Sequence, residues 1–222
     1  MEAIYRLIPI ALAVAISSIP ITIAIFILLS PHRTRSAVAF LAGWVAGIAL
    51  LVTACALFVH GVAAPQFGAG SDTVVGVVEI VVGFALIVLA AVTWWRSRAH
   101  TAAASAPKWV TASKRLGPWS SLGVGFLLNF RPKGILLAIA AGVTVHADAA
   151  TLPVAVVAVV VYTVVGASTV AAPIVAMLTV PSVVEPRLVR INAWMVRHGG
   201  ALARVILAVV GVAIVGMGIA RL

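Results

Sequence analysis

The sequence predicts an all-α integral membrane protein with six transmembrane helices. Hydrophobic residues make up 64% of the 222 residues, charged residues make up 9%, and the mean hydropathy is +1.23. In soluble domains, by contrast, about a quarter of the residues are charged. The chain contains apolar runs of roughly 20 residues, the length that crosses a bilayer, and two of these runs carry a proline near the middle. We therefore expect one transmembrane domain that covers residues 1–222.

The residues within and beside the apolar runs support their assignment as spans. The first run is too long for the apolar core of a signal peptide and stops at Pro31. The second contains Gly43 and Gly47, a small-xxx-small pattern that lets two helices pack closely, either within one chain or in a homodimer. The third ends in two tryptophans and Arg96, as is typical of a membrane interface. The expected spans cover residues 7–29, 37–59, 73–95, 119–143, 152–178 and 202–220.

The segment 181–198, between the last two spans, has a different pattern. On a helix, its arginines lie on one face and its apolar residues lie on another. This arrangement predicts an amphipathic helix on the membrane surface, with a polar loop as the alternative.

The distribution of cations predicts the topology. Nearly all lysines and arginines between the spans follow spans one, three and five, and the basic connection 96–118 is the longest. The positive-inside rule therefore places both termini outside the cytoplasm. Because three spans are an odd number, a second set of three enters the membrane inverted, which predicts two inverted repeats at about residues 6–95 and 119–222. Pro20 and Pro132 occupy corresponding positions in the first spans of these repeats.

The fourth span is interrupted by Asn129-Phe130-Arg131-Pro132-Lys133-Gly134. Pro132 removes a backbone donor, clashes with the carbonyl of Leu128 and disfavours the α conformation at Arg131, so the helix is expected to break there. Backbone groups freed at membrane depth are tolerated only beside protein or water. We therefore predict helix breaks at Pro20, Pro132 and Gly134, with a central cavity between the first and fourth helices.

Five polar residues are candidates for binding a substrate in this cavity: Asn129, Arg131, Lys133, Ser17 and Ser18. Arg131 and Lys133 would bind a phosphate, sulfate or carboxylate. The alternatives are a buried ion pair, most obviously with Glu79, and a position of the motif nearer the interface. The two serines would line the first break, or bond only to the preceding turn of their own helix.

Other polar residues point to few further kinds of chemistry. Glu79 is the only carboxylate well inside an expected span, and we predict that it carries a proton that couples export. His146 and Asp148 are expected in an external loop without a metal, because two ligands alone make a weak site. Cys55 is the only cysteine, which excludes an internal disulfide. We expect no cofactor, no catalytic residues and no enzymatic activity, and the +10 charge fits loops at a membrane better than nucleic acid.

Several stretches resemble the GAP family, the peptidoglycolipid-addressing proteins of the lysine-exporter (LysE) superfamily. The resemblance covers residues 6–60, with Ser17-Ser18-Ile19-Pro20 and Phe40-Leu41-Ala42-Gly43-Trp44, and returns at residues 125–134. In relatives the fourth-span motif is closer to Asn-Pro-Lys, whereas here Phe130 and Arg131 intervene. The resemblance implies delivery of a lipid, in mycobacteria typically a glycolipid, and the superfamily implies a homodimer.

Together these observations predict an exporter in the bacterial cytoplasmic (inner) membrane. We expect an anionic or amphiphilic substrate, a lipid or glycolipid, that leaves the cytoplasmic side through a cavity between helices one and four. The alternatives are an exporter of amino acids or similar metabolites, and a non-transporting scaffold for lipid synthesis or export machinery. Expected partners are membrane lipids, the lipid substrate, a second copy of the chain and lipid-export machinery, but no nucleic acid.

Overall fold

The computed structural model describes residues 2–30, 33–63, 71–99 and 117–222, and every regular element within them is a helix. Most of the predicted basic connection, and part of the link between spans two and three, lie outside these residues. The elements are α1 (Glu2–Ala15), α2 (Ser18–Leu28), α3 (Arg33–Ala63), α4 (Ser71–Ala99), α6 (Pro118–Leu127), the short 3-10 helix η1 (Leu128–Phe130), α7 (Pro132–Asp148), α8 (Leu152–Thr179) and α9 (Pro181–Ile219).

The helices confirm the predicted class, an all-α multi-pass membrane protein. Four helices are long and apolar enough to cross a membrane: α3, α4, α8 and the second part of α9. Two further spans are possible in length and composition if each bent helix pair crosses once. The pair α1 and α2 is bent by 52°, and the pair formed by α6 with η1 and by α7 is bent by 67°. By length and composition, the described residues thus provide four to six spans.

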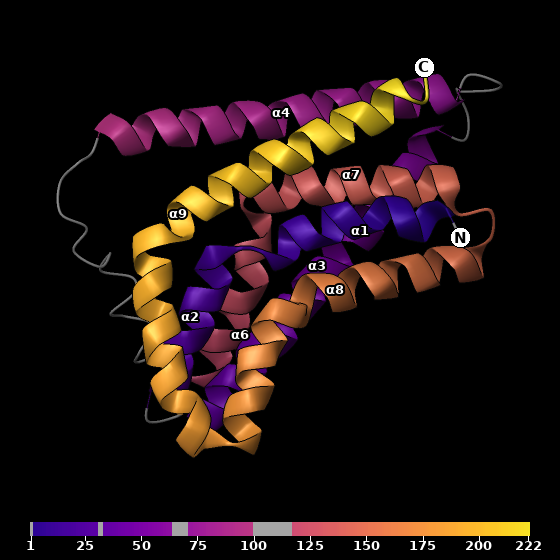
Figure 1. Ribbon diagram of the computed structural model, residues 1–222. Coiled ribbons are helices and arrows are strands. Elements are labelled where there is room, and N and C mark those ends of the chain that lie inside the picture. The colour runs from indigo at the N-terminus through magenta and orange to yellow at the C-terminus, as the bar shows by residue number, and fades with distance from the viewer. Residues whose placement is uncertain (1, 31–32, 64–70, 100–116) are drawn as a thin grey trace.

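Glycines set the close contact between α4 and α9, which run side by side along one edge of the molecule (Figure 1). A Cβ atom at Gly83 would lie 2.7 Å from the carbonyl oxygen of Gly211, and one at Gly211 would lie 2.8 Å from that of Gly83. Gly76 and Gly218 approach one another in the same reciprocal way. The two backbones therefore touch where side chains are absent.

The small-xxx-small pattern of α3 packs within the chain. A Cβ atom at Gly43 would lie 2.1 Å from the carbonyl oxygen of Leu122, and one at Gly125 would lie 2.3 Å from that of Phe40. Gly47 has a similar role, because its missing Cβ leaves room for the side chain of Asn129. The close contact between α3 and α6 therefore uses these glycines, and the predicted homodimer needs a different surface.

This contact predicts a stability difference between two glycines of α6. Gly125→Ala is expected to lower the free energy of unfolding by about 1–3 kcal/mol, because the new methyl group overlaps the backbone of α3. Gly123→Ala is the matched control, since a Cβ atom there meets nothing within 4 Å. Thermal unfolding of both variants in detergent measures the effect. Equal melting temperatures for the two variants would contradict the packing described here.

The segment 181–198 is helical, as predicted, but it is not a separate surface helix. It forms the first half of α9, which continues without interruption into the last span. Figure 1 shows that α9 curves: its first part runs beside α2 and its last part runs beside α4. Packing of Leu188, which is 4% exposed, draws this segment onto the helical core. The arginine-rich face predicted its helical form but not its attachment to the sixth span.

Candidate functional site

The first helix break lies one turn before Pro20. Helix α1 ends at Ala15, α2 begins at Ser18, and Pro20 occupies the first turn of α2, where a missing N–H group costs nothing. A continuous helix would need the N–H group of residue 20 to bond the carbonyl oxygen of Ile16. The proline therefore causes the break, although the sequence prediction placed the break at the proline itself.

Side chains from other helices bind the carbonyl groups that this break frees. The Nζ atom of Lys133 donates to the carbonyl oxygen of Ile16 at 3.5 Å, so a cation of the second break caps the first. The hydroxyl group of Thr169, on α8, donates to the carbonyl oxygen of Ala15. A cation suits this position, because the C-terminal end of a helix carries partial negative charge.

The second break has the predicted backbone conformation. Arg131 is extended, with φ −75° and ψ 155°, and Pro132 is the first residue of α7. Gly134 is needed here, since a Cβ atom would lie 2.1 Å from the carbonyl oxygen of Asn129. The proline and the glycine therefore act together: one prevents a continuous helix, and the other lets α7 begin against the preceding turn.

Asn129 holds this break together. Its side chain is buried, and its Nδ2 atom lies 3.1 Å from the carbonyl oxygen of Gly125 and 3.3 Å from that of Trp44. The amide thereby ties α6 to α3 at the point where the fourth span loses its regular hydrogen bonds. This contact accounts for the amide donors of Asn129, and a part in substrate binding stays a prediction.

Both breaks open onto one cavity of about 540 Å³. The five predicted binding residues, Ser17, Ser18, Asn129, Arg131 and Lys133, all line it, together with Pro20, Pro132 and Gly134. Apolar and aromatic side chains supply most of the remaining wall, including those of Trp44, Leu137 and Tyr162.

The cavity is cationic. Arg131, Lys133 and Arg204 line it, and none of the described residues that line it is acidic. Arg131 has no acidic partner in the part of the chain that the structure describes. The first turns of α2 and α7 also face the cavity, and N–H groups in the first turn of a helix have no partner within the helix. Cations and two helix N-termini together form an environment suited to an anion.

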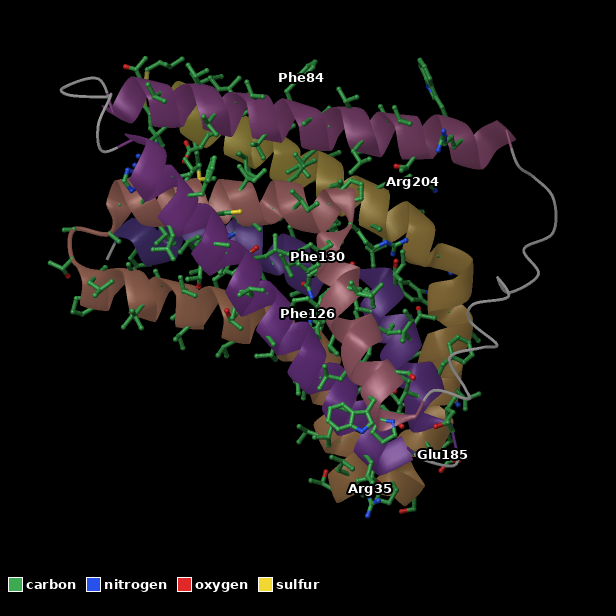
Figure 2. The ribbon with its side chains drawn as sticks, turned by 180° about the vertical axis from the view of Figure 1, so that it is seen from behind. Arg35, Phe84, Phe126, Phe130, Glu185 and Arg204 are labelled. Atoms are coloured by element: carbon green, nitrogen blue, oxygen red, sulfur yellow. The ribbon has the colours of Figure 1, made fainter. Side chains whose placement is uncertain are left out.

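Arg204 is the cavity residue that sequence reasoning missed. It lies on α9, inside the sixth span, where the sequence predicted no binding residue (Figure 2). The sequence did contain an indication of this role, because Arg204 is the third residue of the expected span 202–220. An arginine inside a transmembrane span is costly unless it faces protein or water. Thr93, on α4, also lines the cavity and was not predicted.

Glu79 lies in a different place from the cavity cations. It is 1% exposed, and its Oε2 atom accepts a hydrogen bond from Nε of Arg221 at 3.1 Å. The hydroxyl group of Thr144 lies 3.5 Å from Oε1. The predicted alternative, an ion pair of Glu79 with Arg131 or Lys133, is therefore wrong, because the C-terminal arginine takes that role.

Arg221 also binds Asp148, through Nη2 to Oδ2 at 2.7 Å, and Arg6 approaches the same carboxylate at 3.9 Å. Asp148 ends α7 and is nearly buried, so the external loop predicted for His146 and Asp148 is not formed at these residues. Burial alone would lower the pKa of Arg221, but hydrogen bonding to Asp148 and the charge of Glu79 outweigh it and raise the pKa. We call these four residues, Arg6, Glu79, Asp148 and Arg221, the terminal ion cluster.

The fold and the cavity define a multi-pass, all-helical membrane protein with a cationic site at paired helix breaks. Residues 7–220 match the model of a protein family described as Sap, sulfolipid-1-addressing protein. The chain therefore belongs to this family, which is related to the peptidoglycolipid-addressing type that the sequence resembles. Searches of curated proteins and of solved structures found no significant match.

Family membership has a functional consequence. It supports the predicted lipid-related role in a membrane, since the family's description is that of a lipid-addressing protein. Membership of the lysine-exporter superfamily stays a prediction. Among the described residues, no group of three or more His, Cys, Asp or Glu side chains is placed to hold a metal ion.

Proposed function

We propose that this protein exports a lipid with an anionic headgroup, and that the headgroup binds in the cavity between the two helix breaks. One observation carries the proposal: three cations and two helix N-termini face a cavity that no carboxylate lines among the residues the structure describes. An anion there would meet charge-assisted donors in surroundings of low dielectric constant. The family's description names a sulfolipid, which makes a sulfate group the first candidate for the anion.

The packing of the helices supports two inverted repeats of three spans. Helix α3 of the first repeat packs on α6 of the second, and α8 of the second repeat packs on α1 of the first. These two contacts correspond, because α3 and α8 are the second spans of their repeats, and α1 and α6 begin the first spans. The third and sixth spans meet at Gly83 and Gly211, each against the other's carbonyl oxygen, as expected for residues close to a twofold axis. We propose that the lysine-exporter plan accounts for this arrangement.

The charges of the chain support the predicted direction of export. Both termini lie at the same end of the molecule (Figure 1), and the positive-inside rule makes this the extracytoplasmic end. The cavity reaches Thr93, near the end of α4, and Arg204, near the start of the last span. Both of these helix ends adjoin basic segments of the chain. In this orientation the cavity faces the cytoplasmic membrane surface, and the terminal ion cluster closes the opposite end.

The energy source of export is a further part of the proposal. Glu79 would carry the coupling proton, and its protonation would release Arg221 and loosen the terminal ion cluster. We further propose that the exporter is a homodimer in the bacterial inner membrane and that it contacts lipid-export machinery there. The volume of the cavity also suits a small metabolite, since binding sites for small molecules have volumes of about 300–1,000 Å³. An exporter of amino acids is therefore the second candidate.

A matched pair of lipids tests this proposal. Sulfatide and galactosylceramide differ only in a sulfate group, and both can be prepared with a fluorescent label. In liposomes that contain the protein, sulfatide is expected to change leaflet faster than galactosylceramide and faster than in protein-free liposomes. Equal rates with and without the protein would contradict export and favour the scaffold. Efflux of a labelled amino acid, without sulfatide movement, would favour the metabolite exporter.

A further inference from the structure

A second hollow in the molecule is an apolar groove of about 670 Å³ between α3, α4 and α7. Leu50 and Phe58 of α3, Val78 of α4, and Ile139 of α7 are among the residues that line it. Among the described residues of its wall, His146 and the Cys55 thiol are the titratable side chains. The groove is therefore suited to an apolar occupant without charge.

The groove and the cationic cavity share a wall. Leu51 lines both hollows, so they adjoin at this residue. At the second break, Phe130 lines the groove and the next residue, Arg131, lines the cavity. Figure 2 shows Phe130 in the middle of the molecule, beside α3. The extra Phe130-Arg131 pair thus places one residue in each hollow.

The groove lies between two helices that cross the membrane. α3 and α4 follow one another in the chain, yet both pack on α7, and neither is packed closely on the other among the described residues. Phe58 is 71% exposed and Phe130 is 45% exposed, although both are large and apolar. The gap between α3 and α4 therefore presents apolar side chains toward the surroundings of the spans, where acyl chains are the abundant apolar molecules.

We infer that the groove holds an acyl chain of the lipid whose anionic headgroup occupies the cavity. This inference rests on the proposed function. A headgroup bound beside Arg131 and Lys133 carries its acyl chains with it, and a cavity of about 540 Å³ that already holds the headgroup leaves little room for long chains. The groove gives one chain an apolar path to the bilayer past Leu51. Bulk lipid is as apolar as the groove, so there is little hydrophobic driving force for the chain to leave lipid for the groove. The groove instead provides a space for the chain while the headgroup stays bound.

Two probes separate binding of the chain from binding of the headgroup. Sulfatide carries long chains, whereas galactose sulfate is the same headgroup without them. Val78→Trp fills the groove, and Val81→Trp is the matched control, because Val81 is on the same helix, 60% exposed and outside the groove. In nanodiscs, Val78→Trp is expected to raise the Kd for sulfatide about tenfold, or about 1.4 kcal/mol, and to leave the Kd for galactose sulfate unchanged. Val81→Trp is expected to change neither.

A crosslinking experiment on the unaltered protein makes the test independent of how the variants fold. Sulfatide with a diazirine in its acyl chain is expected to label peptides of α3, α4 and α7, and excess unlabelled sulfatide is expected to suppress the labelling. Ala54→Trp, which fills the same groove from α3, provides a second variant.

The outcomes distinguish the inference from the proposed function. Labelling of other helices, or an equal change in the Kd for sulfatide in Val78→Trp and Val81→Trp, would overturn the acyl-chain site. Binding of galactose sulfate would then still support the anion site in the cavity. A loss of both ligands in Val78→Trp would also overturn it, because the effect would not be specific to the chain. Failure of the unaltered protein to prefer sulfatide over galactosylceramide would instead overturn the proposed function.

Discussion

Removing both cations of the second break, as Arg131→Gln with Lys133→Gln, is expected to weaken binding of sulfatide at least a hundredfold. Each cation can offer a charge-assisted hydrogen bond to the anion, and such a bond contributes about 1.5–3 kcal/mol, where every 1.4 kcal/mol is tenfold. Both side chains line the cavity, and Arg131 has no acidic partner among the described residues. Binding in nanodiscs and leaflet exchange in liposomes both measure the loss.

Glutamine at position 133 keeps a donor but shortens the side chain, so the contact between Lys133 and the carbonyl oxygen of Ile16 has to be checked separately. Melting temperatures of the single and double variants provide this check. Arg190→Gln is the control for charge alone, because Arg190 is exposed on α9 and does not line the cavity. Unchanged sulfatide binding in a well-folded double variant would contradict the proposed anion site.

Replacing Arg221 with methionine is expected to lower the free energy of unfolding by about 3–5 kcal/mol, the usual cost of removing one partner from a buried ion pair. The side chain of Arg221 is 7% exposed, and its removal leaves the buried carboxylates of Glu79 and Asp148 without their shared cation. Thermal or denaturant unfolding in detergent measures this loss.

Two controls isolate the ion cluster from a general effect at the C-terminus. Deletion of Leu222, which is 66% exposed, is expected to change stability little. Adding Glu79→Gln to Arg221→Met is expected to recover part of the lost stability, because Glu79 loses its cation in Arg221→Met, whereas Asp148 keeps Arg6 nearby. Equal stability of Arg221→Met and the unaltered protein would show that the cluster does not hold α4 and α7 to the C-terminus.

Local features of the sequence predict the membrane class, the positions of most helices and the existence of both breaks. These features depend on local chemistry: long apolar runs enter a bilayer, and a proline prevents the backbone bond that would continue a helix. The conformation of Arg131 followed from Pro132 for the same reason. The first break was displaced by one turn from Pro20, because a proline acts on the carbonyl group four residues before it.

The pairing of the polar residues, by contrast, depends on how distant helices pack. Arg204 joins the cavity from the other end of the chain, and Glu79 pairs with Arg221, which is 142 residues away. The donor of Asn129 binds a carbonyl group of α3, and the cation of Lys133 binds one at the end of α1. Local pattern sets where a helix begins, ends or breaks, whereas the partner of a buried charge depends on which helices pack together. That packing is set here by glycines whose contacts lie far along the chain.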